Sequence, residues 1–188
     1  MKKNKTAIPE KVLHQVLKPA RYTGGEFGNK YKDEQNIPVK FALAFPDIYD
    51  VGMSYLGFKI LYHLLNQQEY IWAERVYTPW VDMQKIMQAE QLTLGSIESK
   101  RALNEFDFVG FTLQYEMSYT NIVKMLQLGK IDLLAKERDE NQPFIVGGGP
   151  CVYNCEPLAD FFDIFIIGEG EEVLIELCAA YKNWKLAG

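Results

Sequence analysis

Short apolar stretches alternate with helical stretches from residue 38 onward, and this alternation limits the possible folds more than any other feature of the chain. The apolar stretches span 39–45, 70–77, 107–113, 143–146 and 163–167. Most of them have the near-continuous apolar character of strands buried in a parallel sheet, whereas 70–77 is less uniformly apolar and is predicted to lie nearer an edge. Strands joined by helices form parallel sheets with right-handed crossovers and helices on both faces. The pattern therefore predicts a doubly wound α/β domain.

Helices are predicted between these strands from apolar residues at helical spacing. They span 56–65, 79–90, 119–134, 157–161 and 171–185. Thr78 and Pro79 suit the N-cap and the first position of the second of these helices. Stretch 92–97 fits either a short extra strand or a loop. Together these elements predict a flavodoxin-like (Rossmann-like) five-stranded parallel sheet of order 2-1-3-4-5, in which the first strand lies between the second and the third.

Residues 1–37 are predicted to form an arm outside this fold, and residues 38–188 to form the α/β domain. A short helix begins at Pro9 and reaches Leu17 in this prediction, and the glycines that follow disfavour regular structure. The arm carries a net charge of +4, whereas the rest of the chain carries −9. Two interpretations follow: the arm lies on its own acidic domain, or it offers a basic dock to another domain or partner.

Composition excludes several classes of protein. A hydrophobic content of 48% is ample for a core, and a net charge of −5 argues against nucleic acid as the main partner. No stretch approaches the ~20 apolar residues of a membrane span, and no secretory signal follows the N-terminus. The three cysteines are an odd number, which favours a reducing compartment over a disulfide framework. We therefore expect a cytoplasmic protein with no membrane partner.

The loop after the first strand is the first place to expect a ligand. Asp47, Tyr49 and Gly52 lie between Pro46, which ends that strand, and the first long helix. Ligands of open α/β sheets bind at the carboxyl ends of the strands, beside the point where the strand order reverses. This loop is therefore a predicted part of a binding site.

Three consecutive glycines, Gly147, Gly148 and Gly149, follow the fourth strand. Glycine there permits either a tight turn at the sheet edge or the close approach of a flat ligand. A dinucleotide-binding fingerprint would need glycine or alanine at position 152, but Val152 stands there and Pro150 breaks the turn. Dinucleotide binding is therefore not predicted, and the two other interpretations stay open.

No catalytic or metal-binding arrangement is predicted within this chain. Cys151, Cys155 and Leu158 have the C-x3-C-x2-C spacing of a radical-initiating [4Fe-4S] cluster, but the third position lacks its thiolate. Only two histidines are present, so neither a histidine metal site nor a catalytic triad can be nominated. We expect this chain alone to have no enzymatic activity.

The loop after the first strand resembles a known binding motif. Asp47-x-Tyr49-x-x-Gly52 has the spacing of the D-x-H-x-x-G loop of cobalamin-binding (B12-binding) domains, with tyrosine in place of the histidine that ligates cobalt. The glycines at 147–149 fall where those domains carry the Gly-Gly that admits the dimethylbenzimidazole tail. Thr112 lies near the position of their serine after the third strand, although S-x-L reads Thr-Leu-Gln here.

Three further stretches extend the resemblance over the whole chain. Residues 159–171 are similar to the end of the B12-binding domain of cobalamin-dependent radical SAM proteins. Residues 18–22 and 113–116 resemble an uncharacterised radical SAM family. That resemblance implies a module that positions a base-off corrinoid without a histidine ligand over a barrel active site. It also implies a radical SAM domain, C-terminal to this chain and absent from it, which would hold the [4Fe-4S] cluster and S-adenosylmethionine and would be the partner of this module.

The alternative is a structural scaffold or interaction domain that has lost corrinoid binding. A free groove between the first and fourth strands would favour corrinoid binding. A groove filled by Tyr49, Tyr115 or Tyr119 would favour the scaffold. A phenol of pKa about 10 is a poor neutral ligand for a metal. A bound corrinoid would therefore be base-off without a histidine ligand, or would have a water held under cobalt by Tyr49.

Overall fold

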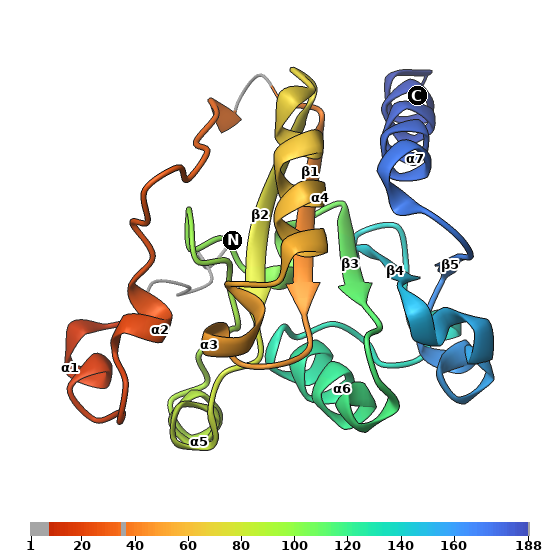
Figure 1. Cartoon of the computed structure of the whole chain (residues 1–188). Helices are drawn as coiled ribbons and strands as arrows, with labels where there is room; N and C mark the ends of the chain where they lie inside the picture. Colours follow the sequence, from red (N-terminus) through yellow and green to blue (C-terminus); the bar gives the residue numbers. More distant parts are fainter. Residues whose placement is uncertain (1–7, 35–36, 188) are drawn as a thin grey trace.

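The computed structural model describes residues 8–34 and 37–187, so residues 1–7, 35–36 and 188 of the predicted arm and domain lie outside the described residues. A five-stranded, all-parallel sheet forms the centre of the domain (Figure 1). Its strands are β1 (Val39–Phe45), β2 (Ile71–Tyr77), β3 (Phe108–Thr112), β4 (Phe144–Gly148) and β5 (Ile164–Ile166). Their order, β2-β1-β3-β4-β5, confirms the predicted topology.

The two faces of β1 carry side chains of different size. Phe41 and Leu43 belong to the core on one face of the sheet, whereas Ala42 and Ala44 belong to the core on the other. This alternation follows from the two-residue period of a strand. The large side chains fill the space under α4 (Leu56–Gln67) and α7 (Gly170–Ala187), which pack against each other.

The opposite face of the sheet is covered by α5 (Val81–Ala89) and α6 (Tyr119–Leu128). Met83 and Met87 of α5 and Ile122 of α6 are buried there, as their helical spacing predicted. Full burial of a side chain of this size contributes roughly 1.5–3 kcal/mol. Burial on both faces therefore holds the sheet between two helical layers.

Short elements complete the chain. The remaining α-helical turns are α1 (Glu10–Leu13), α2 (Ala20–Thr23) and α3 (Tyr49–Gly52). The 3-10 turns are η2 (Leu103–Glu105), η3 (Glu116–Ser118), η4 (Ala135–Glu137), η5 (Pro150–Asn154) and η6 (Glu156–Phe161). The helix predicted over 157–161 is thus a 3-10 helix, and α2 was not predicted.

Three predicted helix ends were wrong. The helix expected from Pro79 begins at Val81, because the Thr78 side chain is buried and its Oγ1 donates to Met125 Sδ at 3.0 Å instead of capping a helix. The helix expected to reach residue 134 ends at Leu128, since Lys130 adopts a left-handed conformation with φ of 56°. The helix expected to reach Leu17 ends at Leu13.

The stretch 92–97, which fitted either a strand or a loop, is a loop with one antiparallel bridge between Gly95 and Ala102. Its last residue lies against the outer edge of β2, where Ile97 N donates to Arg75 O at 2.9 Å. The loop therefore covers part of that edge.

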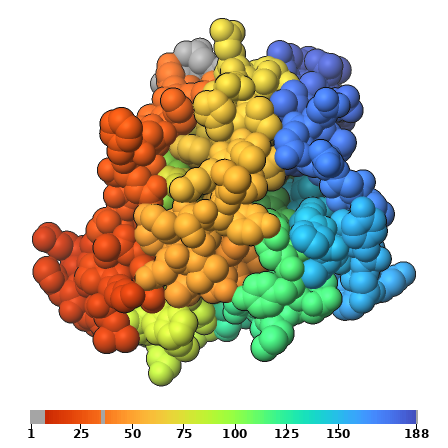
Figure 2. Space-filling view, viewed as in Figure 1, coloured from red at the N-terminus to blue at the C-terminus, as the bar shows by residue number. Residues whose placement is uncertain are grey.

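The arm lies on its own acidic domain, as the first of the two interpretations predicted. Figure 2 shows it packed along one side of the molecule beside α4. Lys18 and Arg21 both pair with Asp50, at 3.1 and 2.5 Å. Val12 and Val16 are buried in the core with α5 and α6. The arm is thus part of the folded domain.

Main-chain groups along the outer edge of β2 are hydrogen-bonded to side chains from other parts of the domain. Lys32 Nζ donates to Ile71 O at 2.5 Å, and the Asn66 side chain bonds both the N–H and the carbonyl of Ala73, at 3.2 and 3.0 Å. Arg75 N donates to Glu98 Oε2 at 2.8 Å. Side chains and loops therefore occupy the positions that another strand would use.

Candidate functional site

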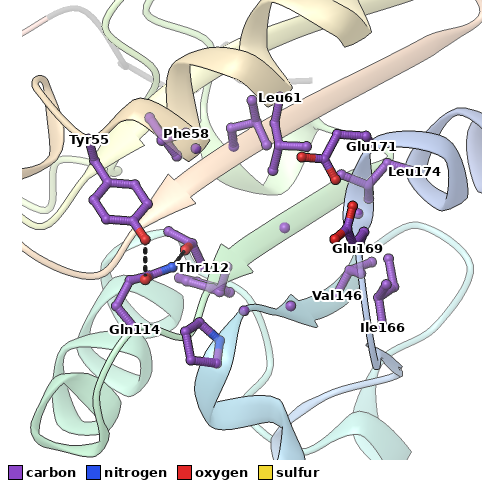
Figure 3. Close-up of a pocket in the computed structure, with 18 of the residues that line it drawn as sticks. Tyr55, Phe58, Leu61, Thr112, Gln114, Val146, Ile166, Glu169, Glu171 and Leu174 are labelled. Carbon is purple, nitrogen blue, oxygen red and sulfur yellow. Dashed lines mark hydrogen bonds between the residues drawn. The ribbon is translucent and has the colours of Figure 1, made fainter.

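A cavity of about 350 Å³ lies between the sheet and the pair of helices α4 and α7 (Figure 3). Side chains from both helices and from the four strands β1, β3, β4 and β5 wall it. The apolar part of the wall is formed by Leu43, Phe58, Leu61, Val146, Ile166 and Leu174. Since β1, β3, β4 and the start of α7 all contribute, the cavity lies beside the point between β1 and β3 where the strand order reverses. Ligands of this fold class bind in that region.

Glycine opens this cavity at the end of β4. A Cβ atom built on Gly148 would meet no atom within 4 Å, so the strand presents bare backbone to empty space. Gly149 follows with φ of 109°, a conformation that side chains rarely adopt, and a Cβ there would lie 3.0 Å from Leu113 O. Gly148 therefore leaves room for a ligand, and Gly149 lets the chain turn into η5.

Gly147 has a different role. A Cβ on Gly147 would lie 2.9 Å from the Phe165 ring and 3.1 Å from the Phe162 ring, and those two rings stack with centroids 5.1 Å apart. Gly147 is not among the residues that line the cavity. Its small size admits the two rings rather than a ligand.

A chain of three polar side chains crosses the cavity at the carboxyl ends of the strands. Tyr55 Oη donates to Gln114 Oε1 at 2.5 Å, and Gln114 Nε2 donates in turn to Thr112 Oγ1 (Figure 3). Tyr55 is the N-cap residue of α4, and Thr112 is the last residue of β3. The chain therefore connects the start of a helix with the end of the neighbouring strand.

Asp47 makes a second connection beside the first. Its Oδ2 accepts a hydrogen bond from Tyr115 Oη at 2.7 Å, and its Oδ1 accepts one from Ile48 N at 2.7 Å. The hydrogen bond to this carboxylate is the main reason that the pKa of Tyr115 is raised. Asp47 does not line the cavity, but it fixes the loop at its edge.

Tyr49 points to the arm. Its Oη donates to the Glu26 carboxylate, and its ring lies edge-on to Tyr77 with centroids 5.3 Å apart. Burial and this hydrogen bond raise the pKa of Tyr49 to about 12. Tyr49 lines a separate small cavity under the arm, not the one beside Gly148.

Gly52 serves packing. A Cβ there would lie 2.7 Å from the Tyr77 ring and 2.8 Å from the Phe45 ring. Its absence lets the loop after β1 lie directly on these rings, which belong to the core under α4.

Of the seven predicted site residues, the structure brings Thr112, Gly148 and Gly149 together at the cavity. None of the three tyrosines that could have filled the groove lines it: Tyr49, Tyr115 and Tyr119 all lie elsewhere. Sequence reasoning missed Tyr55 and Gln114. Their signal was their position directly before a helix and directly after a strand, at the carboxyl edge.

The charged groups of the cavity are carboxylates. Glu169 and Glu171 lie at the end opposite Tyr55, and no Lys, Arg or His is found among the described residues that line it (Figure 3). A phosphate group inside the cavity would be repelled by these acids. The interior is therefore suited to a neutral, flat, mainly apolar group.

The three cysteines are free and, in the part of the chain that the structure describes, form no metal-binding group. Cys151 and Cys155 are partly exposed in and after η5, whereas Cys178 is buried in α7. In residues 8–34 and 37–187, no three His, Cys, Asp or Glu side chains are grouped so that they could hold a metal ion. In the same residues, no helix has the length and apolar character needed to cross a membrane.

Two comparisons place the chain among known proteins. The family model described as "Radical SAM proteins, N-terminal" matches residues 57–188. The uncharacterized protein MJ0966 of Methanocaldococcus jannaschii is 37% identical over 86 residues, which are 43% of this chain and 17% of that relative. The chain thus matches only a small part of the length of this relative.

Proposed function

This chain belongs to the family of N-terminal domains of radical SAM proteins, and from that premise we propose that its groove beside Gly148 holds the lower-base ring at the end of a corrinoid's nucleotide tail. The corrinoid would be held base-off, with no ligand to cobalt from the described residues. The domain positions it for a radical SAM domain, which would hold S-adenosylmethionine and a [4Fe-4S] cluster. The supporting observation is the empty space of about 350 Å³ that the bare backbone of Gly148 faces.

The walls suit the ring of a lower base such as dimethylbenzimidazole. Phe58, Leu61 and Val146 offer apolar surface, and Gly148 permits a flat ring to lie directly on the strand. Burial of a few hundred Å² at ~25 cal/mol per Å² corresponds to several kcal/mol before ordering costs. This term is larger than a single neutral hydrogen bond of ~1 kcal/mol. Ring burial is thus expected to be the main source of affinity.

Thr112 supplies the polar contact. Its Oγ1 accepts a hydrogen bond from Gln114 Nε2, so its own hydroxyl hydrogen can point into the groove. An unprotonated ring nitrogen, freed from cobalt in the base-off form, is a suitable acceptor for it.

The residues of this chain do not fit a role as lower ligand to cobalt. The Tyr49 phenol is held by Glu26 under the arm, and Asp47 is bonded to Tyr115. When bound, a corrinoid supplies methyl-transfer or one-electron chemistry at cobalt. The role of this domain is to hold and orient the tail and to exclude water from the ring.

A scaffold without bound corrinoid is the second candidate. The hydrogen bonds from Tyr55 to Gln114 and from Tyr115 to Asp47 connect the two sides of the carboxyl edge. A tail that leaves the groove at this edge would have to pass them. If they do not open, the domain orders its neighbour without binding a cofactor.

Titration of the purified chain with methylcobalamin tests the proposal. Loss of the lower base from cobalt changes the visible absorbance, and the wild type is expected to show this change with saturation. A graded series, Gly148→Ala, Gly148→Val and Gly148→Leu, fills the groove stepwise, so affinity should fall with side-chain size. Ala180→Val, on the exposed face of α7, is the control and should leave affinity unchanged. No absorbance change with wild type up to the solubility limit would leave the scaffold as the function.

A further inference from the structure

We infer that Tyr55 and Gln114 set the hydrogen-bonding polarity of the groove, so that Thr112 presents a donor and the site prefers a ring with an acceptor nitrogen. This inference rests on the proposed function, because it takes the ligand to be a ring in the groove. Tyr55 and Gln114 are positioning residues in it: they act through Thr112.

The direction of the chain is set by which end of the Gln114 amide faces each hydroxyl, because the Tyr55 and Thr112 hydroxyls can each donate or accept. The Gln114 carbonyl Oε1 can only accept, and it accepts from Tyr55 Oη at 2.5 Å. The Gln114 amide nitrogen can only donate, and it donates to Thr112 Oγ1. The Thr112 hydroxyl is therefore occupied as an acceptor. Its own hydrogen donates to no other group among the described residues, which leaves it for a ligand.

Tyr55 is what keeps the amide in this orientation. The two ends of an amide have the same size, so Gln114 could turn over and offer Oε1 to Thr112. The Thr112 hydroxyl would then donate to Gln114, and the groove would lose its donor. The hydrogen bond from Tyr55 opposes this turn, because a phenol is a better donor than acceptor and the turned amide would make Tyr55 Oη accept from Nε2.

The Tyr55 ring is partly exposed and packs against the protein on its inner side. It contacts the Phe45 ring at 5.6 Å between centroids, and Gly57 leaves room beside it, since a Cβ on Gly57 would lie 3.3 Å from the Tyr55 ring. The hydroxyl is thus carried by a ring that packs on the end of β1. Its bond to Gln114 spans 59 residues of sequence.

The chemical class of the preferred ligand follows. The ring should be flat and neutral and should carry an unprotonated nitrogen that accepts from Thr112. A benzimidazole has such a nitrogen. An indole of the same shape has a carbon in its place and gives Thr112 no acceptor, which leaves a buried hydroxyl with an unmade bond.

Two ring compounds test this inference on the full chain: 5,6-dimethylbenzimidazole and 5,6-dimethylindole, titrated by NMR well above the pKa of the benzimidazole. Wild type is expected to bind the benzimidazole about fivefold more tightly, the effect of one neutral hydrogen bond. Tyr55→Phe should bring the ratio of the two dissociation constants close to one. Tyr70→Phe removes a hydroxyl that bonds Ile175 O at 3.4 Å, away from the groove, and should keep the wild-type ratio.

Gln114→Glu is a second, nearly isosteric test. An ionised carboxylate only accepts, so it would take hydrogen bonds from both Tyr55 and Thr112 and remove the donor from the groove. The ratio of the dissociation constants of the two ring compounds should therefore also be close to one for Gln114→Glu. An unchanged ratio in Tyr55→Phe and Gln114→Glu would overturn the inference, and so would equal affinities in wild type.

The methylcobalamin titration distinguishes failure of this inference from failure of the proposed function. Methylcobalamin binding by wild type together with a ring ratio of one would overturn only the role of Tyr55 and Gln114. Failure of wild type to bind either ring or methylcobalamin would overturn the inference and the proposed function together.

Discussion

The phenol of Tyr49 donates to the carboxylate of Glu26, a residue of the arm that lies 23 positions earlier in the chain. Glu26 also pairs with Arg75 of β2 at 2.8 Å. Tyr49, which the motif resemblance places at the position of a histidine, is therefore tied to the arm and to the edge of the sheet. This arrangement makes the arm part of the loop's structure and separates Tyr49 from the groove beside Gly148.

Tyr49→Phe is predicted to leave corrinoid affinity within about twofold of wild type, because the phenol is directed at Glu26. The free energy of unfolding should fall by about 1 kcal/mol, the value of one hydrogen bond, since Glu26 keeps its partner Arg75. Urea unfolding and methylcobalamin titration measure the two quantities. A tenfold loss of affinity would show that Tyr49 acts at cobalt.

Alkaline pH should weaken the fold through Tyr49. Its pKa in the folded protein is about 12, above the ordinary value of 10. The folded state thus holds the phenol proton of Tyr49 more tightly than the unfolded state does. The contribution of this proton to the free energy of unfolding is fully present below pH 10 and is lost as pH rises towards 12. In Glu26→Gln the pKa of Tyr49 should fall only part of the way towards 10, because the burial of its ring, which also raises this pKa, remains. The difference in tyrosinate absorbance between a protein and its Tyr49→Phe form gives this pKa, and an unchanged value would contradict the assigned cause.

Gly147 and Gly148 should respond differently to the same substitution. Gly147→Ala places a Cβ 2.9 Å from Phe165 and is predicted to destabilise the fold by about 1–3 kcal/mol through overpacking. Gly148→Ala places a Cβ in open space and should change stability by less than about 0.5 kcal/mol. Urea unfolding of both variants gives the comparison. Equal destabilisation would mean that Gly148 does not face an empty groove.

The buried ion pair on β2 should be sensitive to the loss of one partner. Arg75 and Glu98 are both buried, with their charged atoms 2.7 Å apart. Glu98→Gln should cost about 3 kcal/mol, since it leaves a buried guanidinium with a weaker partner. Glu26→Gln removes a more exposed carboxylate from the same guanidinium and should cost about 1 kcal/mol. The order of the two unfolding midpoints in urea tests this, and a reversed order would show that Glu26 is the principal partner.

The sheet could be predicted from sequence because each strand is a short apolar stretch that can be recognised without its neighbours. The parallel order follows from the alternation of these stretches with helices. Helix ends were less predictable. Threonine is a residue type that commonly caps helices, yet the Thr78 hydroxyl donates to Met125 Sδ, which is 47 residues away in the sequence. A local pattern cannot contain that contact.

The site was predictable only in part for the same reason. The glycines at 147–149 marked the correct strand end, but which of them faces the groove depends on the register of β4 and on the rings of Phe162 and Phe165. Tyr55 and Gln114 belong to the site because two loops distant in sequence meet there. Tyr49 stands where the resembled motif has its histidine, and it lies outside the groove because it is bonded to Glu26 of the arm.

The filled outer edge of β2 has a consequence for how copies of this chain meet. An exposed edge strand is a template on which a second chain can add its own strand and start an aggregate. Lys32, Asn66 and Glu98 already occupy the main-chain groups of that edge. At the other side of the sheet, β5 is only 3 residues long, which is too short to guide such an addition. Neighbouring copies therefore lack a template at either edge, and concentrated domain should resist growth into β-rich assemblies as long as the arm stays in place.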